Sequence, residues 1–244
     1  LDERESNFLF DKCNTISKKN KIVSYLDVKP DSQSVYENNH SVKNFFQAIT
    51  TNIIGVDEEL DIFFNKIFSN KEVITVLKKF TGEGYILNNL SMRYMNRNSK
   101  FVGWHQDDPN AFSLAILLNN TDHNSATTTF IKSSHMFKHK FGKSLEKINP
   151  KYFKEISHRA IGRKGEIYFF SNSTIHGVQV GSASTVIIGC FLPKEYIDKK
   201  QIFPKLTLYN KDYNIALDNE LGRLLNFNDK KTYQYRLETD HKKS

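Results

Sequence analysis

The sequence lacks the features that mark a secreted or membrane-bound protein. It has only two cysteines, Cys13 and Cys190, far apart in 244 residues, so we expect free thiols in a reducing compartment rather than a disulfide framework. No apolar run approaches the roughly 20 residues that cross a bilayer. The opening residues are acidic and lack the basic-then-apolar order of a secretory signal. These absences favour a cytoplasmic protein with no membrane contact.

A dense block of basic residues is also missing. The formal net charge is +8, and a charge of this size is compatible with a basic polyanion-binding module. The lysines are scattered along the chain, however, and no nucleic-acid-binding motif is visible. We therefore expect no nucleic-acid partner.

No internal repeat or low-complexity linker divides the chain, and its length allows one domain with a sizeable core. We expect a single domain over residues 1–244. Residues 1–83 should be mainly helical, because segments 40–53, 57–70 and 71–80 place apolar residues at intervals of three and four.

From residue 84 the chain changes to short runs rich in aromatic and β-branched residues, separated by Gly, Asn, Ser and Asp. Seven such runs lie within residues 84–194, a density typical of a sandwich or barrel rather than of alternating strands and helices. We expect these residues to form a mainly β core with helices packed outside. Residues 195–244 should form a C-terminal extension with one amphipathic helix, in segment 218–227.

The segment "FVGWHQDDP" (101–109) carries a histidine and an acid two residues apart, His105 and Asp107. On an extended backbone, residues i and i+2 point to the same side, so this pair can present one nitrogen and one oxygen to one point. His176 is a third ligand candidate, since it opens the run "IHGVQVG" after a turn that ends an apolar strand. Two histidines and one carboxylate form the facial triad of non-haem Fe(II) oxygenases, and zinc accepts the same ligand types.

The sequence resembles the phytanoyl-CoA dioxygenase-like Fe(II)/2-oxoglutarate oxygenases in three segments, "GWHQDDP", "TTTFIKSSH" and "GEIYFFSNSTIHGVQVG", which occur in the family's order over residues 84–194. The resemblance implies a double-stranded β-helix, or jelly-roll, fold. It also implies Fe(II) bound by His105, Asp107 and His176, with 2-oxoglutarate and O2 as co-substrates.

Two departures from the family pattern are visible. The family's Pro-Gly-Ser-His turn is replaced by "KSSH" (132–135), and we interpret its His135 as a structural or supporting residue rather than a ligand. The family also carries an arginine about ten residues beyond the distal histidine, which pairs with the far carboxylate of 2-oxoglutarate. Here no Lys or Arg follows His176 until Lys194, and alignment places Thr185 at the arginine position.

A cation for the co-substrate must then come from another strand. We nominate Arg93, in "LSMRYMNR", with an outward-facing strand residue as the alternative interpretation. Asn88 lies on the same run, where the family often contacts the co-substrate. Thr185 would add a neutral hydrogen bond. Of the residues beside the metal ligands, we expect Trp104 to pack in the core and Asp108 to bond backbone amides at the start of a loop.

These observations lead to the expectation of an Fe(II)- and 2-oxoglutarate-dependent dioxygenase that hydroxylates a small molecule and releases succinate and CO2. An acid at Asp107, rather than a small residue that would leave room for chloride, favours hydroxylation over halogenation. The alternative is a metal-binding jelly-roll enzyme with another co-substrate or none, such as a hydrolase or isomerase. A basic polyanion-binding module is the least favoured interpretation.

Overall fold

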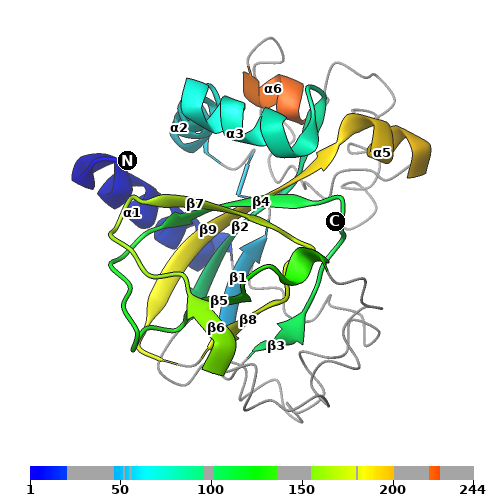
Figure 1. Ribbon diagram of the computed structural model, residues 1–244. Helices are drawn as coiled ribbons and strands as arrows, with labels where there is room; N and C mark the ends of the chain where they lie inside the picture. The colour runs from blue at the N-terminus through cyan, green and yellow to red at the C-terminus, as the bar shows by residue number, and fades with distance from the viewer. Residues whose placement is uncertain are drawn as a thin grey trace.

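Two antiparallel β-sheets form the centre of the protein (Figure 1). The computed structural model describes residues 1–20, 47–51, 53–54, 57–95, 102–136, 155–179, 181–200 and 220–225. One sheet has five strands in the order β1-β2-β9-β4-β7, and the other has four in the order β3-β8-β5-β6. The strands are β1 (Gln47–Thr51), β2 (Tyr85–Met95), β3 (Val102–His105), β4 (Phe112–Leu117), β5 (Thr127–Ile131), β6 (Ser157–Arg159), β7 (Ile167–Ser171), β8 (His176–Gln179) and β9 (Ser184–Pro193).

The chain crosses repeatedly from one sheet to the other. Strands β4, β7 and β9 belong to the larger sheet, and the strands that precede each of them, β3, β6 and β8, belong to the smaller one. This interleaving is the double-sheet arrangement predicted for the core. All seven runs predicted as strands form strands, and the pairing within both sheets is antiparallel throughout the described residues.

Strand β9 shows how the larger sheet serves two cores. Val186 and Ile188 pack with Val178 of β8 in a cluster between the two sheets. Ile187 and Phe191 point to the other face, where they belong to the cluster that the helices cover. Because successive side chains alternate across a strand, the parity of a residue in β9 decides whether it faces the interior or the helices.

Helices cover the outer face of the five-stranded sheet, as Figure 1 shows for α2, α3 and α6. The described helices are α1 (Glu3–Asn20), α2 (Glu58–Phe68), α3 (Lys71–Thr81), α5 (Lys194–Lys200), α6 (Glu220–Leu224) and the 3-10 turn η3 (Ser134–Met136). Among them, none is long and apolar enough to cross a membrane.

Local sequence explains α2 and α3, which confirm two of the predicted helices. The side chain of Asp57 accepts a hydrogen bond from the backbone N–H of Leu60, and Asn70 does the same for Glu72, so each helix begins at a capping residue. Their apolar stripes are fully buried against the sheet through residues such as Phe64. Burial of one such side chain contributes about 1.5–3 kcal/mol. Segment 218–227 also contains its predicted helix, α6.

The helix predicted for 40–53 is wrong where the structure describes it. Residues Gln47–Thr51 form strand β1, paired with β2 along its whole length. This segment ends in the run Ile-Thr-Thr, and β-branched side chains are restricted in a helix and favoured in a strand. Residues 40–46 lie outside the described residues.

Candidate metal centre

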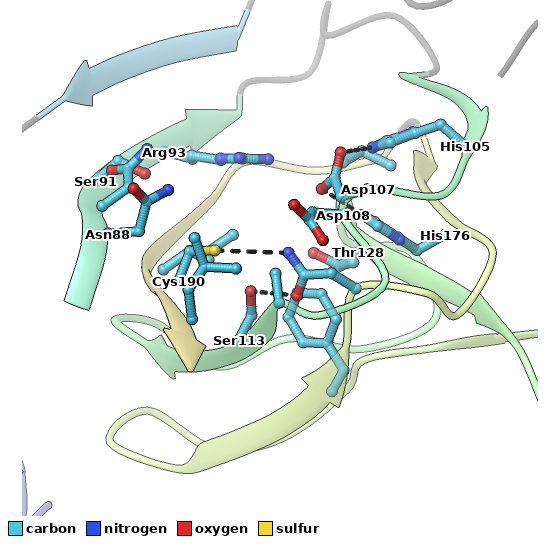
Figure 2. Close-up of a pocket in the computed structure, with 17 residues that line it drawn as sticks. Asn88, Ser91, Arg93, His105, Asp107, Asp108, Ser113, Thr128, His176 and Cys190 are labelled. Atoms are coloured by element: carbon cyan, nitrogen blue, oxygen red, sulfur yellow. Dashed lines mark hydrogen bonds and ion pairs between the residues drawn. The ribbon is translucent and has the colours of Figure 1, made fainter. Parts of the chain in front are cut away.

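The three predicted metal ligands come together at one end of the two sheets. His105 ends β3 and His176 begins β8, and the two residues are direct partners in the antiparallel pairing. Asp107 follows β3, with its carboxylate oxygens 4.0 Å from His105 Nε2 and 3.5 Å from His176 Nε2. One ligand atom from each residue lies within 4.8 Å of the others, as Figure 2 shows. This is a geometry that one metal ion can close.

The segment carrying Asp107 is tied to the turn before His176. The backbone N–H of Asp107 donates to the carbonyl of Asn172 at 2.9 Å, and the Gln106 side-chain amide donates to the carbonyl of Ser173 at 2.5 Å. Because Gln106 points away from Asp107 along the chain, it is available for this second tie. The two ligand-bearing segments are thereby held in register before any ligand binds.

The ring of His176 is oriented by its own chain. Its Nδ1 lies 2.8 Å from the carbonyl oxygen of Thr174, which accepts a hydrogen bond only from a protonated Nδ1. Nε2, the nitrogen that faces Asp107, is then the one with a lone pair available to a metal. A hydrogen bond to a backbone carbonyl is the usual way in which a ligating histidine is oriented.

The pKa of the Asp107 carboxyl lies well below its usual range. Burial of the carboxylate raises this pKa, but the hydrogen bond with His176 and the positive charges of His105 and Arg93 outweigh it. The carboxylate is therefore ionised at neutral pH. A charged oxygen beside two imidazole nitrogens suits a divalent cation.

A cavity of about 480 Å³ opens beside these three residues and is walled by both sheets. One wall is β2, which contains a β-bulge: its register with β9 shifts between Leu87 and Asn89, so Asn88 is the extra residue. Bulges re-aim side chains next to active sites, and here Asn88 and Asn89 both line the cavity. Each has a buried side-chain oxygen with no hydrogen-bond partner in the described structure. A bound molecule with N–H or O–H groups would satisfy them.

Arg93 lies on the same wall of the cavity. Figure 2 shows its side chain extending from β2 toward Asp107. Its Nε is buried and has no hydrogen-bond partner in the part of the chain that the structure describes. Among the described residues lining this cavity, Arg93 is the one Lys or Arg. The structure therefore places Arg93 facing the cavity, rather than outward as the alternative interpretation held.

Thr185 is not among the residues that line the cavity. It has the same parity in β9 as Ile187, which faces the helices, and its backbone N–H donates to the Asn119 side chain. The next residue, Val186, is the one that faces the space between the sheets. The alignment that placed Thr185 at the arginine position is thus one residue out of phase with the cavity, and nothing in its placement supports a role in co-substrate binding.

The neighbours of the triad have the structural roles predicted for them. Trp104 is 2% exposed and packs against Ile131 and Ile175, which confirms its place in the core. Asp108 accepts a hydrogen bond from the backbone N–H of Asn110 at 2.9 Å, as predicted for a loop start. Its other oxygen accepts a bond from the Tyr196 hydroxyl at 2.8 Å.

Sequence patterns did not reveal the polar network around Asn172. Its side-chain oxygen accepts a hydrogen bond from the Ser113 hydroxyl at 2.7 Å, and its amide donates to Cys190 Sγ at 3.8 Å. Both cysteines are free, as predicted. Burial raises the pKa of the Cys190 thiol to about 12, so this group lines the cavity in its neutral form.

His135 lies outside the cluster of metal-ligating atoms and is exposed in the turn η3. Its neighbour Ser134, which sequence reasoning passed over, has the supporting role instead. The Ser134 hydroxyl donates to the carbonyl of Ile131 at 2.6 Å and accepts from the backbone N–H of Ile175 at 2.7 Å. It thus holds the residue immediately before His176 against β5.

We expect the variant Ser133→Gly to be more stable than the parent. Ser133 has φ 63°, a left-handed conformation that strains a residue with a Cβ, and the resembling family has glycine at this position. Relief of that strain, less the greater freedom of glycine in the unfolded chain, leaves a gain of about 0.5–1 kcal/mol. A thermal melt should show a rise of about 1–4 °C. A lower melting temperature would contradict this, and Ser134→Ala is the control expected to lower it.

Comparison with known proteins agrees with this architecture. No protein-family model matches the sequence, and no curated protein matches it. The solved structure of HygX from Streptomyces hygroscopicus, with nickel and 2-oxoglutarate bound, has a TM-score of 0.57 at 6% identity, covering 80% of this chain and 80% of HygX. The epimerase SnoN, in complex with Fe3+, alpha ketoglutarate and nogalamycin RO, has a TM-score of 0.59 at 12% identity, covering 79% and 76%.

A third solved structure, EvdMO1, has a TM-score of 0.52 at 14% identity, and the match covers 80% of this chain but only 45% of EvdMO1. The chain therefore spans less than half the length of that protein. Identities this low speak for the fold alone. The protein has the jelly-roll fold of HygX and SnoN, solved structures that hold a metal ion and 2-oxoglutarate.

Proposed function

We propose that this protein is an Fe(II)- and 2-oxoglutarate-dependent dioxygenase that hydroxylates a small-molecule substrate. The observation that carries the proposal is the convergence of His105, Asp107 and His176 at the wall of one cavity. The likeness in fold to HygX and SnoN, both solved with a metal and 2-oxoglutarate, supports the same cofactors. So does the order of the motifs that resemble the phytanoyl-CoA dioxygenase-like family.

The donor set fits this metal. Two imidazole nitrogens and one carboxylate oxygen occupy one face of an octahedral ion and leave the opposite positions open. When bound, iron with 2-oxoglutarate and O2 would supply the oxidation, in which R–H, 2-oxoglutarate and O2 give R–OH, succinate and CO2. The chain's own part is to hold the ligand atoms in place and to exclude water from the reacting centre. Phe170 and Ile188, which also line the cavity, are suited to the second task.

A small-molecule substrate fits the size of the cavity. A volume of about 480 Å³ lies within the range of roughly 300–1,000 Å³ that is usual for small ligands. HygX has also been solved with hygromycin B bound, and SnoN with nogalamycin RO. The acid at Asp107 occupies the position that a halogenase leaves open for chloride, which supports hydroxylation as the outcome.

Anaerobic titration tests the proposal. We expect the purified protein, loaded with Fe(II), to develop a visible metal-to-ligand charge-transfer band as 2-oxoglutarate is added. On admission of O2 it should form succinate, and omission of either Fe(II) or 2-oxoglutarate should stop this. Zinc-loaded protein is the matched control, since the same ligands bind zinc without a charge-transfer band. A protein that binds Fe(II) but gives neither band nor succinate would favour a metal-binding jelly-roll enzyme with another co-substrate or none.

A further inference from the structure

The place of the missing cation is the feature from which the inference starts, and it rests on the function proposed above. In the resembling family, the arginine that pairs with the far carboxylate of 2-oxoglutarate follows the distal histidine by about ten residues. In this chain the residue ten positions after His176 is Val186, and no Lys or Arg occurs before Lys194. A dicarboxylate in the cavity therefore finds no cation on β9.

Arg93 lies directly across the sheet from that position. In the antiparallel pairing of β2 with β9, Arg93 and Val186 are register partners. Side chains of such partners stand on the same face of a sheet with Cβ atoms about 4.5–5.5 Å apart. Val186 faces the space between the sheets and Arg93 lines the cavity, so both side chains share this face. A guanidinium based on β2 can thus reach the region that an arginine on β9 would reach.

The surroundings of Arg93 call for an anion. Its Nε is buried without a hydrogen-bond partner in the described structure, and an unmade bond of a buried polar group is costly. Among the described residues, no carboxylate forms an ion pair with it. Its charge nevertheless acts on Asp107, Tyr168 and Cys190. The guanidinium is therefore close to the metal centre without being neutralised by it.

We propose that Arg93, on β2, binds the far carboxylate of 2-oxoglutarate in place of a residue on β9. The anchor has moved by one strand at the same level of the sheet, and the co-substrate keeps its orientation toward the metal. This role differs from a purely structural one, in which Arg93 would only balance the charge of Asp107. The two roles predict different responses to the length and charge of the ligand.

A thermodynamic cycle separates them. The two ligands are 2-oxoglutarate and 2-oxopentanoate, which has the same chain length but a methyl group in place of the far carboxylate. Each is titrated anaerobically into the Fe(II) form of the parent and of Arg93→Met, with the charge-transfer band as the readout. We expect the parent to prefer 2-oxoglutarate by about 10- to 100-fold, the range for a charge-assisted hydrogen bond. In Arg93→Met this preference should vanish, because only 2-oxoglutarate loses affinity.

Two further variants guard against a fold that fails. Arg93→Lys keeps the charge but not the bidentate fork, so it should retain part of the preference. The exchange Arg93→Val with Val186→Arg returns the cation to β9 using the same two side chains. It should recover a preference that Arg93→Val alone lacks. The Fe(II) affinity of each variant, measured separately, should stay within about threefold of the parent, since no metal ligand is changed.

The inference is overturned if Arg93→Met keeps the preference for 2-oxoglutarate, or if both ligands weaken equally and Fe(II) affinity falls with them. The second result would assign Arg93 a structural role. These outcomes differ from failure of the proposed function, which would show as an Fe(II)-loaded parent that gives no band with either ligand. In that case the assignment of Arg93 falls as well.

Discussion

Replacement of His176 by alanine should abolish Fe(II) binding and leave the fold in place. The reason is that His176 supplies one of the three ligand atoms that lie within 4.8 Å of one another. Loss of a residue that only supports a metal ligand lowers affinity by about 10- to 100-fold, and loss of a ligand itself should exceed this. Iron content after anaerobic reconstitution, with a far-UV circular dichroism spectrum of the same sample, measures both parts of the expectation.

The matched control is His135→Ala. His135 belongs to the same set of resembling motifs but is exposed and outside the ligand cluster, so its variant should bind iron like the parent. His176 is 7% exposed and touches the rings of Phe130 and Phe170, so its replacement should also cost about 1–3 kcal/mol of stability. Full iron affinity in His176→Ala, or loss of iron in His135→Ala, would contradict the assignment.

The sequence predicted the sheets better than the first helix and strand. The seven core strands carry aromatic and β-branched runs bounded by turn residues, a signal that depends on short segments alone. Helix α1 was missed, although its start has a local mark: Asp2 and Glu5 each bond the other's backbone N–H. This reciprocal capping places the start of a helix in the sequence. Strand β1 was missed because its apolar spacing suits a helix, while its pairing with the edge of β2 decides the outcome.

The candidate site divides in the same way. The spacing of His105 and Asp107 fixes a shared side through strand geometry, so their convergence was predictable. The residues that hold them are different in kind. Asn172 and Ser134 act through hydrogen bonds to segments far away in the sequence, Ser113 and Ile175. No periodicity signals such bonds, because they depend on which strand ends the fold brings together.

The misplacement of Thr185 has a definite physical cause. An alignment by strand composition carries an uncertainty of one residue, and in a strand one residue is the difference between the two faces of the sheet. The nomination of Arg93 did not depend on that parity, since the bulge at Asn88 precedes it and its cavity face is set by pairing with β9. Its role as an anchor remains a prediction.

Asp107 and Asp108 should separate metal binding from stability, and this is the second large effect that we expect. Asp107→Ala should abolish Fe(II) binding, because its oxygens lie beside both histidine Nε2 atoms. Its side chain is 51% exposed, so its removal should change the melting temperature little. Asp108→Ala should keep the iron. It loses hydrogen bonds from the Asn110 backbone and the Tyr196 hydroxyl, worth about 1–3 kcal/mol together.

The two variants are measured side by side, each for iron content and by thermal melt of the metal-free protein. A loss of about 1–3 kcal/mol in Asp108→Ala corresponds to a melting temperature lower by about 2–12 °C in a protein of this size. Its iron content should match the parent, since Asp108 contacts the loop and α5 rather than the two histidines. Equal loss of iron from both variants would remove the distinction between a ligand and a loop residue. Retained iron in Asp107→Ala would remove the acid from the metal centre altogether.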